Sequence, residues 1–94
     1  MTAMKAVRLL IGGRVQGVGY RAWFAAEARR RGLTGWVRNR REGTVEALLR
    51  GETDVIDAMV AAAHRGPPTA RVDRIEVSEA PDDGGDGFEV WPTV

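Results

Sequence analysis

The stretch GRVQGVGYR, residues 13–21, separates a segment that alternates like a strand from a segment with helical periodicity. Before it, apolar side chains recur at every second position of residues 6–11, which predicts a half-buried strand. After it, apolar side chains recur at helical spacing over residues 20–31, and Gly32 ends that pattern. The stretch is therefore a glycine-rich loop that leads from a strand into a helix.

This loop has the properties of an anion-binding site. Its glycines allow the backbone to curl with the N–H groups pointing inward. No Ser, Thr, Asp or Asn stands just before Tyr20 to cap the helix, so the first N–H groups of the helix have no side-chain acceptor. A phosphate would supply that acceptor and suit the helix dipole, and Arg21 adds a planar cation in the first turn. The loop is not a P-loop, because Val18-Gly19 stands where Lys-Ser/Thr is required, and it lacks the spacing of a dinucleotide fingerprint.

The rest of the chain completes a ferredoxin-like pattern. Two strands at residues 33–41 and 43–50 precede a helix that Thr53-Asp54 would cap and that ends before Pro67-Pro68. Strands follow at 71–79 and 88–91, separated by the turn 81–87, so the last strand comes in one or two pieces. The order βαββαβ predicts one α+β sandwich over residues 1–94, with a mostly antiparallel sheet of four to five strands and two helices on one face.

Composition narrows the class of protein further. The chain has 94 residues, of which 44% are hydrophobic and 29% charged, as in an ordinary soluble domain. It contains no cysteine, so neither a disulfide framework nor a thiolate metal site is available. No apolar run approaches the roughly 18 residues that span a membrane, and the first residues lack a signal-peptide layout. We expect a cytoplasmic protein with no metal and no cofactor.

Charge is divided unevenly along the sequence. Residues 1–50 carry eleven basic and three acidic side chains, whereas residues 51–94 carry three basic and ten acidic ones. One interpretation is that the first half of the chain binds an anionic partner. The other is that solvated surfaces happen to segregate along the chain and that folding mixes them.

Asn39 is a second candidate site residue. It occupies a position of its strand that alternates with Leu33, Gly35 and Val37, where another apolar residue is expected. A buried amide without partners costs about 1–3 kcal/mol. Spacing alone favours a structural role, in which Asn39 ends the strand and its amide makes hydrogen bonds to the turn that follows. The functional alternative is that its amide orients a water beside a bound phosphate. An amide cannot accept a proton, so the base would then be a phosphate oxygen of the substrate.

Four stretches of the chain resemble the acylphosphatase family. They cover almost its whole length: residues 11–21; Gly35-Trp36-Val37-Arg38-Asn39, followed by Gly43-Thr44-Val45 and Gly51; residues 66–72; and residues 88–90. Tyr20 departs from the family pattern, in which Phe is more usual. A hydroxyl at that position would change packing little.

The resemblance implies a small metal-free hydrolase of carboxyl phosphates, such as acetyl phosphate or 1,3-bisphosphoglycerate. By similarity, Arg21 and Asn39 are the catalytic residues: Arg21 binds the phosphoryl group, and Asn39 positions the attacking water. The substrate-binding residues, which act through main-chain N–H groups, are Val15, Gln16, Gly17, Val18, Gly19 and Tyr20. Inorganic phosphate or sulfate should inhibit, and we expect a monomer without a nucleic-acid or membrane partner.

Two other functions are compatible with the fold. The same strand order underlies RNA-recognition domains, but residues 6–12 and 43–51 carry none of the aromatic side chains on which such domains stack bases. Acylphosphatase-like domains also occur inside larger proteins of hydrogenase maturation that use carbamoyl phosphate. A free-standing enzyme is the simpler interpretation, since the sequence has no zinc-binding cysteines. The intact functional residues argue against a protein that kept the fold but lost its activity.

Overall fold

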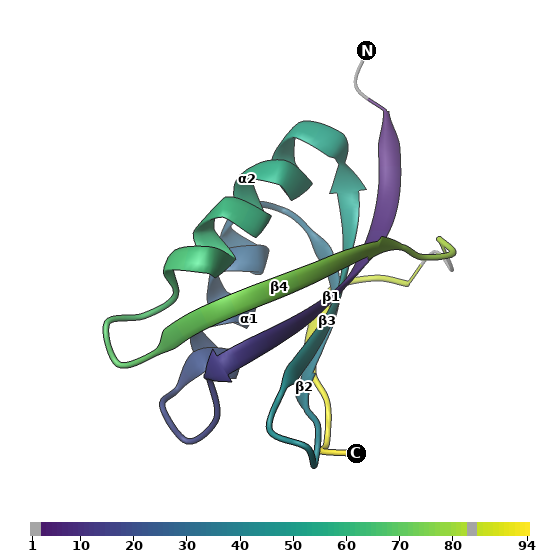
Figure 1. Cartoon of the computed structure of the whole chain (residues 1–94). Coiled ribbons are helices and arrows are strands. Elements are labelled where there is room, and N and C mark those ends of the chain that lie inside the picture. The colour runs from purple at the N-terminus through teal and green to yellow at the C-terminus, as the bar shows by residue number, and fades with distance from the viewer. Residues whose placement is uncertain (1–2, 83–84) are drawn as a thin grey trace.

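The computed structural model describes residues 3–82 and 85–94, so Asp83 and Gly84 of the expected turn at 81–87 lie outside the described residues. These residues form two helices and five strands (Figure 1). In order they are β1 (Met4–Arg14), α1 (Tyr20–Arg30), β2 (Thr34–Asn39), β3 (Val45–Glu52), α2 (Thr53–Arg65), β4 (Arg71–Glu79) and β5 (Phe88–Val90).

The five strands form one sheet in the order β4-β1-β3-β2-β5, and α1 and α2 cover the same face of it (Figure 1). The pairs β1–β3, β1–β4 and β2–β3 are antiparallel, and only β5 joins its neighbour β2 in parallel. This confirms the ferredoxin-like prediction. The last predicted strand does divide in two, and its pieces β4 and β5 lie at opposite edges of the sheet.

The core lies between the sheet and the helices. Alternate residues of β1, β2 and β3 point toward the helices and are buried, as the sequence pattern of residues 6–11 predicted. They pack against one apolar stripe from each helix, and the contiguous cluster includes Leu9, Ile11, Val37, Leu49, Phe24, Ala28, Ile56 and Met59.

The predicted cap of α2 is wrong. No side chain caps the first N–H groups of α2, and Thr53 is its first residue rather than its cap. The Thr53 hydroxyl instead donates a hydrogen bond of 3.1 Å to the carbonyl of Ala3, which also accepts from the Thr53 N–H at 2.9 Å. A partner distant in sequence has thus replaced the local one.

The other face of the sheet carries no helix, and long polar and aromatic side chains cover it. Trp36 stacks on Trp91 with ring centroids 4.4 Å apart, and the Arg38 guanidinium lies 4.7 Å from the Trp36 ring. Beneath such side chains Glu46 and Leu48 are only 4% and 7% exposed. The part of this face over β2 and β3 is therefore covered by the chain's own side chains.

Folding also mixes the two charge groups of the sequence. The β4 strand, from the acidic half, pairs with β1 from the basic half over residues 71–79. Lys5 lies 3.7 Å from Asp57 across the same division. At these contacts, residues of the basic half and of the acidic half lie side by side.

Gly35→Ala should destabilise the protein strongly. Gly35 has a φ of +141°, and a Cβ there would overlap the main-chain carbonyl oxygen of Leu48 on β3. Because neither strand can move without breaking the sheet, we expect a loss of at least about 3 kcal/mol of unfolding free energy in urea titrations. Gly43→Ala is the matched control, since its φ is +102° but nothing lies within 4 Å. That change should cost about 1 kcal/mol, and equal losses would contradict the steric account.

Glu46 is expected to make stability depend on acid pH. Burial alone would raise the pKa of this carboxyl, but hydrogen bonds from Arg38, Arg8 and Arg40 outweigh burial and lower it. The three contacts measure 2.8, 2.6 and 3.1 Å. A lowered folded-state pKa stabilises the native state above the unfolded value near pH 4.5, and that contribution is lost as pH falls through the folded value.

Glu46→Gln should therefore lower unfolding free energy at neutral pH by about 1–3 kcal/mol and weaken its dependence on acid pH. Urea titrations from neutral pH down to about pH 3 measure both effects. Glu42→Gln is the control, because the Glu42 side chain is half exposed and bonds Arg40 at the surface. Little change is expected there. A pH profile of Glu46→Gln parallel to that of the unaltered protein would contradict the assignment.

Candidate phosphate-binding and catalytic site

The candidate residues meet at one edge of the sheet because of its topology. Strands β1 and β2 both run antiparallel to β3, so they point the same way and end at the same edge. The register places Ile11 opposite Val45 and Val45 opposite Asn39. The loop of residues 15–19 leaves β1 at this edge and leads to the first turn of α1. Positions far apart in the sequence are thereby brought to one place.

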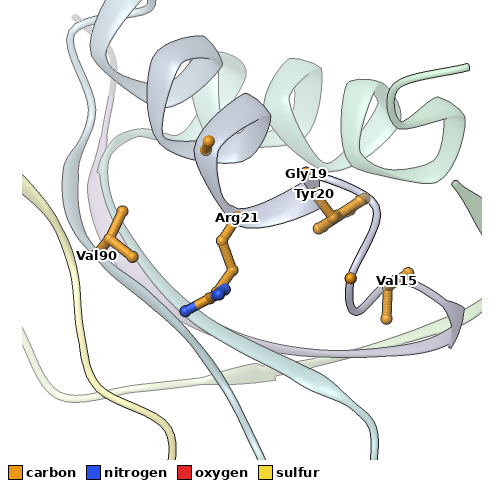
Figure 2. Close-up of a pocket in the computed structure, with 7 residues that line it drawn as sticks. Val15, Gly19, Tyr20, Arg21 and Val90 are labelled. Carbon is orange, nitrogen blue, oxygen red and sulfur yellow. The ribbon is translucent and has the colours of Figure 1, made fainter. Parts of the chain in front are cut away.

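A cavity of about 230 Å³ opens at the start of α1, several times the roughly 30 Å³ that one water occupies in the liquid. The Arg21 side chain extends into it from the first turn, with Val90 of β5 on one side and the loop on the other (Figure 2). Among the described residues, the Arg21 guanidinium has no ion-pair or hydrogen-bond partner. The residues lining the cavity are Val15, Gly17, Gly19, Tyr20, Arg21, Ala22 and Val90.

The loop beside this cavity contains main-chain donors without partners. Gly17 and Gly19 adopt the left-handed conformation, with φ of 73° and 80°. Gly19 is the residue before the helix, and no side chain caps α1, as predicted. Within residues 3–82 and 85–94, no hydrogen bond is donated by the main-chain N–H groups of residues 16–20. These donors and Arg21 together suit a group with several anionic oxygens.

Three hydrogen bonds from two side chains attach the loop to the rest of the fold. Gln16 Nε2 donates to the carbonyls of Arg40 and Thr44, at 2.7 and 2.9 Å. Thr69 Oγ1, between α2 and β4, donates to the Val18 carbonyl at 2.7 Å. For Gln16 the sequence predicted only a main-chain role. It pointed to Thr69 only as part of the stretch 66–72 that resembles the family. Their partners are 24 or more residues away, so no local signal identifies these contacts.

The hydroxyl of Tyr20 has a definite partner. It donates a hydrogen bond of 2.8 Å to the carbonyl of Ala63, near the end of α2. The last carbonyls of a helix lack partners within the helix, so this bond satisfies one of them. Burial raises the pKa of the Tyr20 hydroxyl well above its usual value, which keeps it a donor. The Tyr20 hydroxyl therefore adds a contact between α1 and α2.

The amide of Asn39 remains available for a ligand. Asn39 is 9% exposed, and its Oδ1 is buried without a hydrogen-bond partner among the described residues. The turn after β2 is closed by main-chain bonds from Arg40 N–H to the Thr44 carbonyl and from Gly43 N–H to the Arg40 carbonyl, and among the described residues the Asn39 side chain makes no hydrogen bond to it. The structural role that spacing favoured is therefore wrong. A buried amide oxygen without a donor indicates a position that a water or ligand completes.

The structure brings most of the predicted residues together. Five of them line one cavity, namely Val15, Gly17, Gly19, Tyr20 and Arg21, and Gln16 and Val18 belong to the same loop. Asn39 does not line that cavity but lies at the same edge of the sheet. The sequence did not identify Ala22 and Val90, whose apolar side chains complete the wall. In the described part of the chain, no group of three or more His, Cys, Asp or Glu residues could hold a metal ion.

The fold and the cavity define a class: an α+β sandwich with a glycine-rich loop and an unpartnered arginine at a cavity at one end of its sheet. The comparisons with known proteins identify the family. The acylphosphatase family profile matches residues 7–90. An acylphosphatase from Azorhizobium caulinodans is 57% identical over 90 residues, which cover 94% of this chain and 96% of that protein. The chain belongs to the acylphosphatase family.

Solved structures agree with this assignment. The crystal structure of acylphosphatase from Bacillus subtilis superposes with a TM-score of 0.90 at 37% identity, over 95% of this chain and 99% of that one. The chain is also similar to 12% of full-length HypF, in a phosphate- and nucleotide-bound crystal structure, with a TM-score of 0.89 at 26% identity. No helix in the described residues is long and apolar enough to cross a membrane.

Proposed function

We propose that this chain is an acylphosphatase that hydrolyses the carboxyl-phosphate bond of acyl phosphates to a carboxylate and inorganic phosphate, without a metal ion. Family membership carries the activity. The observation that carries the assignment of the site is the unpartnered Arg21 guanidinium beside the free N–H groups of residues 16–20. Arg21 and these donors bind the phosphoryl group, and Asn39 orients the water.

The proposed reaction needs no strong acid, because a carboxylate is already a good leaving group. A water oxygen forms a bond to phosphorus while the bond between phosphorus and the acyl oxygen breaks. The electron pair leaves with the carboxylate, and a phosphoryl oxygen accepts the proton of the water. Phosphoryl transfer mainly requires positioning and stabilisation of charge on the three equatorial oxygens. A guanidinium and a set of main-chain donors supply that stabilisation.

The two ends of the cavity suit the two ends of such a substrate. The loop and Arg21 offer donors to the phosphoryl group, whereas Ala22 and Val90 offer apolar surface to a short acyl group. Val90 is 45% exposed, so the acyl end would remain open to solvent. Inorganic phosphate or sulfate, which carries only the anionic half, should bind in the loop and inhibit. We propose that the protein acts as a monomer in the cytoplasm.

Hydrolysis of acetyl phosphate and benzoyl phosphate in the presence of a chelator tests this function. We expect turnover of both substrates, unchanged by chelator, and competitive inhibition by inorganic phosphate. Inactivity of the folded protein on both substrates would refute the proposal. Turnover that chelator abolishes would refute only its metal-free form. Size-exclusion chromatography with light scattering tests the proposed monomer.

A further inference from the structure

The side chain of Gln16 lies between the two parts of the proposed site. It extends from the loop of residues 15–19, called the phosphate loop from here on, to the closed end of the β2–β3 hairpin. There its Nε2 donates to the carbonyls of Arg40 and Thr44 at 2.7 and 2.9 Å. Arg40 directly follows Asn39, and Thr44 directly precedes Val45, the β3 partner of Asn39. The Gln16 amide therefore links two elements of the site. One is the loop with the free N–H donors, and the other is the hairpin that carries Asn39, which it contacts on both strands.

Hydrogen bonds to both the Arg40 and the Thr44 carbonyl from one atom require a side-chain nitrogen with at least two N–H donors. The amide nitrogen of glutamine has two N–H bonds, and here each is directed at a carbonyl oxygen. The Thr44 carbonyl also accepts the main-chain N–H of Arg40 at 2.9 Å, so the bridge is continuous with the bond that closes the turn. Any shift of the loop relative to the hairpin would break at least one of these bonds.

The apolar side chains of the loop, Val15 and Val18, pack on the hydrophobic core, but its glycines have no such packing. A Cβ at Gly17 or at Gly19 would meet no atom within 4 Å, so the backbone at both positions borders open space. The other side-chain bond to this segment, from Thr69 to the Val18 carbonyl, attaches it to the connection before β4 and not to the hairpin. Gln16 is thus the side chain that relates the phosphate loop to Asn39.

We propose that Gln16 is a positioning residue that sets the distance between the bound phosphoryl group and the water oriented by Asn39. This inference rests on the proposed function, since it presumes the role of Asn39. It separates Gln16 from the donors that simply bind phosphate. Without the Gln16 amide, the loop should still bind phosphate through its main-chain N–H groups and Arg21. The water, however, should no longer lie in line with the bond between phosphorus and the acyl oxygen. A displacement of about 1 Å in such a geometry can cost on the order of 100-fold in rate.

Two single variants and a double-mutant cycle test the proposal. Gln16→Ala should lower kcat by about tenfold or more and leave the inhibition constant of inorganic phosphate within about threefold. Thr69→Val is the matched control, because it releases the same loop from a different anchor. It should spare kcat and change chiefly phosphate affinity. In the double variant with Asn39→Ala, loss of Gln16 should slow turnover by no more than about twofold beyond Asn39→Ala alone.

The opposite results would overturn the proposal. Multiplicative losses in the double variant would mean that Gln16 acts independently of Asn39. A rise in the phosphate inhibition constant that matches the fall in kcat would make Gln16 a binding residue only. An equal loss of kcat in Thr69→Val would show that any loosening of the loop has the same effect. Gln16→Met keeps the size of the side chain should Gln16→Ala fail to fold, and unfolding of both would assign Gln16 to stability alone. Activity of the unaltered protein, measured first, separates these outcomes from failure of the proposed function.

Discussion

Arg21→Ala should abolish both phosphate binding and turnover. The guanidinium is the one cation that lines the cavity, and it has no partner among the described residues that would compete with a ligand. Removing an arginine that stabilises a phosphoryl-transfer transition state typically costs on the order of 1,000-fold or more in rate. We expect a loss of that size in kcat/KM for acetyl phosphate, together with loss of inhibition by inorganic phosphate.

Two variants sharpen this prediction. Arg21→Lys keeps the charge but loses the planar pair of donors, so it should recover only a small part of the activity. Arg30→Ala removes an arginine from the other end of α1, where Arg30 bonds Glu27 at 2.6 Å away from the cavity. It should change kcat/KM little. If Arg30→Ala were as impaired as Arg21→Ala, general charge rather than the site would explain the effect.

Asn39→Ala should lose most of its turnover while phosphate still binds. Its Oδ1 is buried and has no donor in the described structure, as expected for a group that receives a hydrogen bond from the attacking water. Losing that orientation should reduce kcat on the order of 100-fold. The inhibition constant of phosphate should stay within about threefold, because Arg21 and the loop remain in place.

Asn39→Asp makes the companion measurement. Its side chain has the same shape, but a carboxylate beside the bound phosphoryl group would repel it. Both kcat and phosphate affinity should therefore fall in Asn39→Asp, whereas only kcat falls in Asn39→Ala. Loss of phosphate affinity in Asn39→Ala equal to that in Arg21→Ala would contradict the separation of roles.

The phosphate loop could be predicted from the sequence because its signals are local. Glycines that permit curling, a helix without a side-chain cap and an arginine in the first turn all lie within residues 13–21, and the structure confirms the uncapped start of α1. The alternation of β2 likewise placed Asn39 on the buried face. That its amide oxygen lacks a partner could not be predicted, because this depends on how the following turn is closed.

The remaining parts of the site depend on contacts between distant residues. Val90 reaches the cavity only because β5 pairs with β2 at an edge of the sheet, and the sequence could not place its two last strands at opposite edges. Trp91 could not be placed from the sequence, and the fold stacks it on Trp36. The predicted cap of α2 failed for the same reason, since the Thr53 hydroxyl bonds the distant Ala3 carbonyl.

The account requires that water attacks phosphorus rather than the acyl carbon. Hydrolysis of acetyl phosphate by the protein in water enriched in oxygen-18 tests this directly, with mass spectrometry of both products. We predict one labelled oxygen in the inorganic phosphate and none in the acetate above the uncatalysed background. Label in the acetate would show that water attacks the carbonyl carbon. A site in which the phosphate loop and Arg21 bind the phosphoryl group and Asn39 orients the water does not explain that result.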